Sequence, residues 1–287
     1  MYFSYICCQN KLNPKSRRAI TGTVLIMRRF LTILSAVVLF TFTSCNKITE
    51  GDITRMDYDN PSSYKALEIS NAFEAYVSDN ADVITITAGE NVMPYVVVET
   101  VDNTLKIYLK PITIVDISEL KVILPYNANL TSINLSGASE FHSEYGLKGE
   151  KVKVEMSGAS EFYCDIEADE IDMNLSGASN IEGNVTATEL DLDLSGSSNT
   201  TLIGEVTKLD IEMSGASDIK KTMVGNRYGL VCDDCQGEMS GASDAYIHCD
   251  GTIKVDLSGA SNLHFTGTAF TGDCTTTGGS DIIHDVL

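Results

Sequence analysis

Apolar and polar residues alternate along short segments in the second half of the chain. Val152, Val154 and Met156 alternate with Lys153 and Glu155. The same alternation recurs at 171–175, 190–194, 209–213 and 253–257. A period of two predicts β-strands with one buried face. No segment sustains the helical period, so the pattern favours an all-β protein.

The tetrapeptide Ser-Gly-Ala-Ser, or a close variant, follows each alternating segment. Its eight copies begin at Ser136, Ser157, Ser176, Ser195, Ser214, Ser240, Ser258 and Thr277. Successive starts are 21, 19, 19, 19, 26, 18 and 19 residues apart. This repetition predicts a β-solenoid of about eight coils of ~19 residues over 130–287. A β-propeller would need about four strands per blade and a longer period.

The chemistry of the tetrapeptide suits a stacked corner. Gly takes positive φ without a Cβ clash, and Ser and Ala are small enough to repeat one coil above another. The Ser hydroxyls can bond the local backbone of the turn. The interval of 26 residues holds about seven extra residues, which we place within Asn226–Gln236 as a surface loop. Such a loop is either a binding site or a tolerated insertion.

A β-rich region at 66–129 is expected to cap or continue the solenoid. Strand-like runs lie at 83–87, 95–101, 105–109 and 120–124. Asp102-Asn103 is a plausible hairpin turn between two of these runs. Residues 45–65 hold mostly polar and turn-forming side chains, which indicates a tether.

The N-terminal segment has the order of a secretory signal. Arg28-Arg29 precede an apolar run, 30–42, which closes on Thr43-Ser44-Cys45. We interpret 1–44 as a signal peptide, too short in its apolar part to span a membrane comfortably. A small residue before Cys resembles the lipobox of bacterial lipoproteins, so Cys45 is expected to be the acylated mature N-terminus. The alternatives are a plain signal peptide and an uncleaved anchor.

Met27 stands directly before the two arginines. A signal peptide normally begins near the start of the chain. We therefore expect residues 1–26 to be a mis-assigned gene start, the alternative being a genuine extended basic region.

Acidic residues dominate the charge. The chain holds 20 Lys and Arg against 40 Asp and Glu, and removal of 1–44 takes away six basic residues, which leaves a balance of −26. This charge argues against nucleic acid as a partner and against adhesion to an acidic membrane surface by charge. It also repels polyuronates, the usual substrates of β-helix lyases.

The acids are expected to form ladders along the stack. Two positions before each corner lie Asn134, Glu155, Asn174, Asp193, Glu212, Glu238 and Asp256. Directly after each corner lie Glu140, Glu161, Asn180, Asn199, Asp218, Asp244, Asn262 and Asp281. These ladders are either weak Ca²⁺ sites or a solvated face. No dedicated Ca²⁺ loop is present, which favours the solvated face, and we expect no metal and no cofactor.

No catalytic residue can be assigned from the sequence. Eight equivalent serines cannot each be a nucleophile, and the four histidines, His142, His248, His264 and His284, fall in different coils. Cys232-Asp-Asp-Cys235 and Cys249 leave three readings open: buried thiols, a disulfide or a metal site. Cys235 and Cys274 occupy inward positions of their strands, which favours the first.

A signal with Cys45, a β-rich segment and repeated Leu-Ser-Gly-Ala-Ser corners together resemble the "Putative auto-transporter adhesin, head GIN domain" family over about 66–287. The resemblance implies a right-handed β-helix shaped like pectin lyases but without their catalytic residues. It also implies an envelope lipoprotein with an adhesin-like role.

We therefore expect a non-catalytic lipoprotein of the outer membrane, held there through Cys45, with a binding surface for a glycan or protein. It would lie on the periplasmic face or on the cell surface. A structural or signalling accessory of the envelope is the alternative function. A pectin-lyase-like carbohydrate enzyme is less favoured, because nothing in the repeats supplies a lyase site.

Overall fold

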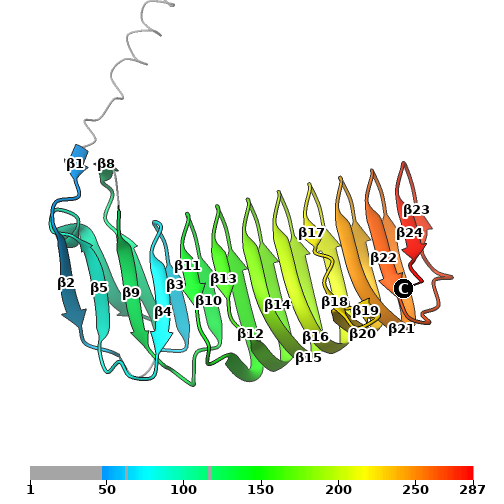
Figure 1. Cartoon of the computed structure of the whole chain (residues 1–287), viewed down its shortest axis with the longest axis horizontal. Coiled ribbons are helices and arrows are strands. Elements are labelled where there is room, and N and C mark those ends of the chain that lie inside the picture. Colours follow the sequence, from blue (N-terminus) through cyan, green and yellow to red (C-terminus); the bar gives the residue numbers. More distant parts are fainter. Residues whose placement is uncertain (1–46, 62–63, 116–117, 287) are drawn as a thin grey trace, which may run out of the picture. The chain divides into compact units, whose positions relative to one another are not determined.

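The computed structural model describes residues 47–61, 64–115 and 118–286. The predicted signal peptide, Met27 and Cys45 lie outside these residues. The described elements are β-strands, apart from one 3-10 turn, η1 (Met93–Tyr95). As Figure 1 shows, strands from successive coils lie side by side along the chain, which confirms the predicted all-β solenoid.

The alternating segments form one parallel sheet, with one strand from each coil. Its members are β10 (Ser132–Leu135), β12 (Leu147–Met156), β14 (Ile166–Leu175), β15 (Asn180–Leu194), β16 (Asn199–Met213), β20 (Leu230–Met239), β21 (Asp244–Leu257) and β23 (Thr275–Thr276). Leu175 pairs with Leu194, and Leu194 pairs with Met213, so like positions stack. Their apolar side chains are buried and form the core.

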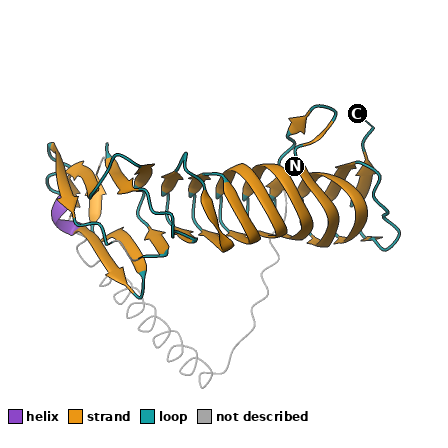
Figure 2. Ribbon diagram, turned by 90° about the horizontal axis from the view of Figure 1, so that it is seen from below, coloured by secondary structure: helices purple, strands orange, loops and turns teal. Residues whose placement is uncertain are grey.

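A second row of strands follows the corners. It contains β11 (Glu140–His142), β13 (Glu161–Tyr163), the first residues of β15, β16 and β21, β17 (Asp218–Ile219), β22 (Asn262–Thr266) and β24 (Asp281–His284). These strands also pair in parallel with their counterparts in neighbouring coils. Figure 2 shows the resulting bands of strand winding around the core.

The corners explain why the tetrapeptide repeats. Gly177 has φ of 77°, and a Cβ on it would come within 2.4 Å of the carbonyl oxygen of Gly158 one coil below. The next amide, that of Ala178, donates to this same carbonyl at 2.7 Å. Only glycine combines this backbone conformation with so close an approach.

The last serine of each corner is buried. Ser179 Oγ donates to the carbonyl of Ser176, the first residue of its own tetrapeptide, at 2.8 Å. The same bond closes the other seven corners at 2.7–3.0 Å. The predicted bonding of Ser hydroxyls to the turn backbone is therefore confirmed.

The N-terminal β region continues the stack directly. β3 (Ala66–Ile69) pairs in parallel with β10, and β4 (Glu74–Ser78) pairs in parallel with β11. The corner between them contains Asn71 at φ of 73°, in the position that glycine holds in the later corners. One core runs without a break from Tyr64 to Phe265, so no core boundary separates this region from the repeats.

Antiparallel strands close the N-terminal end of the stack. β5 (Ile84–Gly89) lies between β2 (Ile53–Tyr58) and β9 (Leu120–Pro125). β6 (Val96–Val101) and β7 (Thr104–Leu109) form a hairpin whose turn, Asp102-Asn103, has φ of 50° and 63°. The predicted hairpin turn is confirmed, and such a change in strand direction covers an otherwise open solenoid end.

The segment expected to be a tether differs from that expectation. β1 (Lys47–Thr49) pairs with β8 (Thr113–Val115), and β2 belongs to the antiparallel end. Glu50 between them accepts hydrogen bonds from the amides of Ser118 and Glu119. Backbone pairing and the Glu50 carboxylate hold this polar segment in place. Its strands were not predicted because the segment lacks an alternating apolar pattern.

The extra residues of the long repeat lie earlier than expected. Thr200 pairs with Ile219, 19 positions on, whereas Gly204 pairs with Leu230, 26 positions on. The insertion therefore lies between Ile219 and Leu230, and the predicted range of 226–236 is wrong because the strand register has already resumed at Leu230. The inserted residues form a hairpin of β18 (Met223–Val224) and β19 (Arg227–Tyr228).

Candidate functional site

A shallow groove runs along the outer face of the parallel sheet, beside the corners. Its first section has a volume of about 440 Å³ and reaches from Asn134 on β10 to Ser195 after β15. A second section of about 280 Å³ shares Asn174 and Asp193 with the first. A third of about 330 Å³ shares Asp210 with the second and reaches Lys254 on β21. The shared residues make the groove continuous across seven successive strands of the sheet.

Two ladders of polar and charged side chains follow the groove, because the strand register stacks equivalent positions. One ladder contains Lys153, Asp172, Asp191, Asp210, Gln236 and Lys254. The other contains Asn134, Glu155, Asn174, Asp193, Glu212, Glu238 and Asp256. The second ladder is the predicted one. The ladder that contains Asp191 was not predicted. Its residues stand four positions before each corner, whereas the prediction covered only the positions two before each corner.

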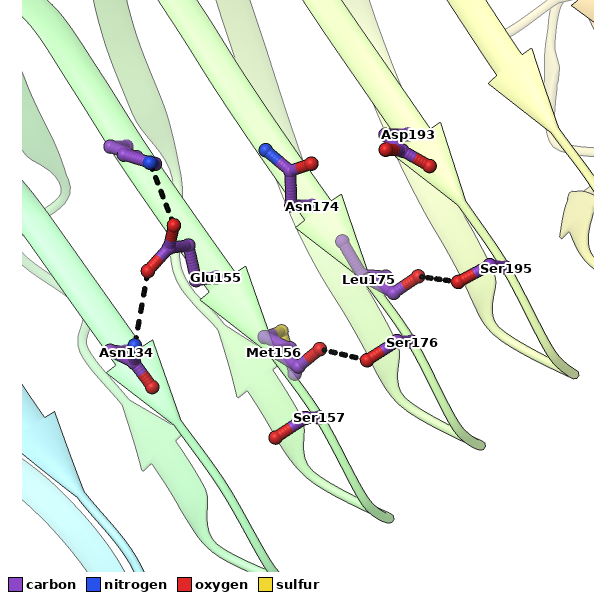
Figure 3. Close-up of a pocket in the computed structure, with 10 residues that line it drawn as sticks. Asn134, Glu155, Met156, Ser157, Asn174, Leu175, Ser176, Asp193 and Ser195 are labelled. Atoms are coloured by element: carbon purple, nitrogen blue, oxygen red, sulfur yellow. Dashed lines mark hydrogen bonds and ion pairs between the residues drawn. The ribbon is translucent and has the colours of Figure 1, made fainter.

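Figure 3 shows how the first section of the groove is arranged. Asn134 Nδ2 donates to Glu155 Oε2 at 3.0 Å, and Lys153 Nζ lies 2.7 Å from Glu155 Oε1. Ser176 and Ser195 turn their hydroxyls back to carbonyls of the coil below, at 3.2 and 3.3 Å. The hydroxyls thus stiffen the edge, while amide, ammonium and carboxylate groups form the open surface.

Partial burial raises the pKa of Asp191 in the middle of the groove, and the negative charges of Glu189, Asp210 and Asp172 add to this effect. In the ladder that contains Asp191, lysines stand only at the two ends, as Lys153 and Lys254. The central section is therefore the most acidic part of the groove. Such a surface accepts hydrogen bonds from hydroxyl or ammonium groups and repels anions.

The ladder directly after the corners lies on the second row of strands. Glu140, Glu161, Asn180 and Asn199 follow one another in register, as predicted. Asn199 Nδ2 donates to Asn180 Oδ1 at 3.0 Å. Amides thus replace repulsion between neighbouring carboxylates with hydrogen bonds, which is the role expected for asparagine in a ladder.

Stacked rings lie two residues further on, at positions for which no role was predicted. His142 is sandwiched between Tyr76 and Tyr163, with ring centroids 4.7 and 4.6 Å apart. His264 stacks on Tyr246 in the same way, at 4.5 Å. Each of these residues stands six positions after the first residue of a corner, which for Tyr76 is Ser70 between β3 and β4, and this spacing is the signal that could have revealed them. The rings cover each other's faces, so these histidines are part of a stack rather than of a catalytic group.

Nothing in the described part of the chain brings three or more His, Cys, Asp or Glu side chains together as metal ligands. The acidic ladders are spread along the strands, one carboxylate per coil, instead of converging on a point. This arrangement agrees with a solvated face and gives no support to the calcium alternative. It likewise gives no support to the metal interpretation of Cys232, Cys235 and Cys249.

The inserted hairpin leaves Met223 and Val224 of β18 exposed but is held to the stack at Tyr228 of β19. Tyr228 is fully buried, and its hydroxyl donates to Asp285 close to the last described residue. Its amide donates to Thr266 Oγ1 on β22 at 3.3 Å. The hairpin therefore fastens the last coils to the insertion, and it does not line the groove.

Stacked coils and a continuous polar groove define a class, that of β-solenoids with a side-chain ladder exposed along one sheet. The chain belongs to the family described as "Putative auto-transporter adhesin, head GIN domain", whose model matches residues 63–184 and 165–269. Membership confirms the predicted family and suggests a cell-surface or envelope protein. No curated protein sequence matches the chain.

Solved structures share the fold at low sequence identity. A putative adhesin from Parabacteroides merdae has a TM-score of 0.72 at 18% identity, over 83% of this chain and 99% of its own. A putative lipid binding protein from Parabacteroides distasonis also has 0.72, at 19% identity, over 84% of this chain and 100% of its own. A putative adhesin from Bacteroides fragilis has 0.58 at 16% identity, over 83% and 100%. Within the described residues, no helix has the length and apolar character to cross a membrane.

Proposed function

We propose that this protein is a non-catalytic lipoprotein of the outer membrane, anchored through acylated Cys45, whose groove is an adhesin-like binding surface. The ligand is a neutral or basic glycan, or a protein segment of that charge. Family membership and the names of the structural neighbours support an adhesin-like role. The order of basic, apolar and small residues before Cys45 supports the lipid anchor.

The continuous groove is the observation that carries this proposal. Its two ladders offer a polar or charged side chain at successive strand spacings of about 4.8 Å, and carboxylates and amides predominate among them. A repeating polar surface suits an extended ligand with its own repeating hydroxyl or ammonium groups. The polar lining favours such a ligand over the lipid named for one neighbour.

The test is binding by residues 46–287, which include every described element and the entire core. Glycan and peptide arrays identify the ligand, and titration then compares two charge reversals on the same strand, β15. Asp193→Lys lies in the groove, whereas Glu182→Lys is exposed on the other row of strands. We expect roughly a tenfold or greater loss of affinity for the groove variant, about the free energy of one charge-assisted hydrogen bond, and little change for its control.

Equal losses in both variants would contradict a groove site. Absence of any ligand on the arrays would favour the alternative, a structural or signalling accessory of the envelope.

The anchor and its location are tested separately. Cys45→Ala is expected to lose the acyl mass and to leave the membrane fraction. Protease treatment of whole cells is expected to cleave the wild-type protein if the groove faces the surroundings. Protection in intact cells, with cleavage after permeabilisation, would contradict the proposal that the protein binds a ligand outside the cell.

A further inference from the structure

Three buried cysteines lie together in the sixth and seventh coils. Cys232 and Cys235 belong to β20, Cys249 belongs to β21, and each is at most 2% exposed. Cys232 and Cys249 are register partners on these adjacent parallel strands. Neighbouring strands lie about 4.8 Å apart, within the range of Cα separations that a disulfide spans.

The two thiols point toward each other's strand. Cys232 Sγ donates to the carbonyl of His248, the residue before Cys249, at 3.6 Å. Cys249 Sγ donates to the carbonyl of Asp233, the residue after Cys232, at 3.1 Å. This reciprocal orientation places both sulfur atoms in the space between the two strands.

We propose that Cys232 and Cys249 form a disulfide that joins these two coils, and that it closes while the coils are stacking. No interaction assigned to the groove uses either residue. The bond would lie in the core, where it replaces two thiol contacts with one covalent link between layers that are otherwise held by hydrogen bonds and packing.

Cys164 and Cys274 are poorly placed to compete. Cys235 has Ile253 as its register partner, and Cys274 Sγ donates to the carbonyl of that same Ile253. Two strand spacings, about 9.6 Å, thus separate Cys235 from Cys274, beyond the reach of a disulfide. Cys164 lies between β13 and β14, several coils away. Only Cys235, three residues from Cys232 on the same strand, remains as a competing partner.

The chemistry is thiol–disulfide exchange with an external disulfide, such as glutathione disulfide or a disulfide-donating protein of the envelope. The thiolate of one cysteine attacks the donor, breaks its S–S bond and releases one donor thiolate. The second cysteine, as thiolate, then attacks the mixed disulfide and releases the other donor thiolate. Two protein thiols lose two electrons and two protons, and the donor disulfide becomes two thiols.

The folded core determines when this exchange can occur. The contact with Cys232, together with burial, raises the pKa of the Cys249 thiol well above its usual range. A buried neutral thiol is a poor nucleophile and is closed to a protein-sized donor. The exchange therefore belongs to the unstacked chain, and reduced protein that has already folded is expected to stay reduced.

The test is refolding of residues 46–287 from the reduced, unfolded state in a buffer of reduced and oxidised glutathione. Free thiols are then alkylated under denaturing conditions, and peptides are mapped by mass spectrometry. We expect a peptide pair that joins Cys232 to Cys249, with Cys164, Cys235 and Cys274 alkylated. Oxidation is expected to raise the Tm by roughly 5–10 °C relative to the same protein refolded with reductant.

Matched variants keep the result interpretable. Cys249→Ala should abolish both the cross-link and the redox dependence of the Tm, whereas Cys164→Ala, which removes a buried thiol elsewhere in the core, should keep both. Five alkylated cysteines after oxidative refolding would overturn the proposal, and so would a link between Cys232 and Cys235.

Closure of the bond in cells rests on the proposed export to the envelope, because a cytoplasmic chain would stay reduced. The refolding experiment does not depend on export. A protein that forms the bond in vitro but is isolated fully reduced from cells would therefore contradict the proposed location and leave the pairing intact.

Discussion

Each corner depends on a residue without a side chain at one backbone position. Gly177 combines positive φ with a carbonyl that leaves no room for a Cβ, and this geometry is copied in the corners above and below. Ala178 and Ser179 complete the corner with one hydrogen bond between coils and one within the turn. Backbone atoms at the glycines, rather than large apolar side chains, thus set the spacing between coils at the corners.

Gly177→Ala is expected to destabilise the protein by at least about 2 kcal/mol. The cost has two parts, the left-handed conformation and a 2.4 Å approach to the Gly158 carbonyl that forces the coils apart. The control is Gly225→Ala, at φ of 63° with no atom within 4 Å of the added Cβ. It should cost only the conformational part, about 1 kcal/mol. Chemical denaturation of both variants measures the difference in the free energy of unfolding. Equal losses of stability would show that the close contact between coils adds nothing to the conformational cost.

The roles of these residues were predictable because repetition makes each corner a copy of the next. Asn71 was not predictable in this way. It takes the same conformation as the corner glycines, as asparagine sometimes does, and Ser70 precedes it, but Phe73 stands where the later corners have their last serine. The chain thus forms a corner whose sequence looks like an ordinary loop.

The inserted hairpin is the element whose position the sequence described least well. Spacing alone revealed seven extra residues but not the point at which the strand register resumes. Its packing depends on Tyr228 and Asp285, which are 57 positions apart in the sequence. β2 was missed for a related reason, since pairing with β5 holds it and its exposed pattern does not indicate a buried face.

Tyr228→Phe is expected to destabilise the last coils by about 1–2 kcal/mol at pH 7, because it removes a hydrogen bond to a carboxylate and keeps the ring. The hydroxyl of Tyr228, followed by His264, holds the pKa of Asp285 below its usual range. A depressed pKa contributes stability above the unfolded value, about 3.9, and this contribution is lost as the pH falls through the lower folded value. The difference between variant and wild type should therefore shrink toward pH 2.

Thermal melting between pH 7 and pH 2 measures this difference, and hydrogen exchange places it in β22 and β24. Tyr108→Phe is the control, because Tyr108 bonds Glu99 at an exposed site at the other end of the stack. A pH-independent loss in the Tyr228 variant would show that the ring's packing, and not the carboxylate, is affected.

At the scale of the whole molecule, charge opposes the stack. The chain without 1–44 has a balance of −26, and the register brings like charges together on β14, β15 and β16, where Asp172, Asp191 and Asp210 follow one another. The existence of acidic ladders was predictable from spacing. The groove was not, because its depth depends on how corner and strand side chains meet across several coils.

Salt is therefore expected to stabilise the protein. Raising NaCl from about 10 mM to 150 mM shortens the screening length from roughly 30 Å to 8 Å and should raise the Tm. Calcium at matched ionic strength should add nothing further, because no three potential ligands converge in the described residues. A calcium-specific rise in Tm, reversed by chelator, would contradict this expectation and restore the calcium alternative.

The in-register stack also has an evolutionary consequence. A corner glycine touches the glycine of the adjacent coil and makes the same contacts at every level. Duplication or deletion of one 19-residue unit in the gene would therefore preserve the corner contacts and the strand register, and the core would have to repack only where the new neighbours meet. The proposed binding groove would lengthen or shorten in steps of one strand spacing, about 4.8 Å.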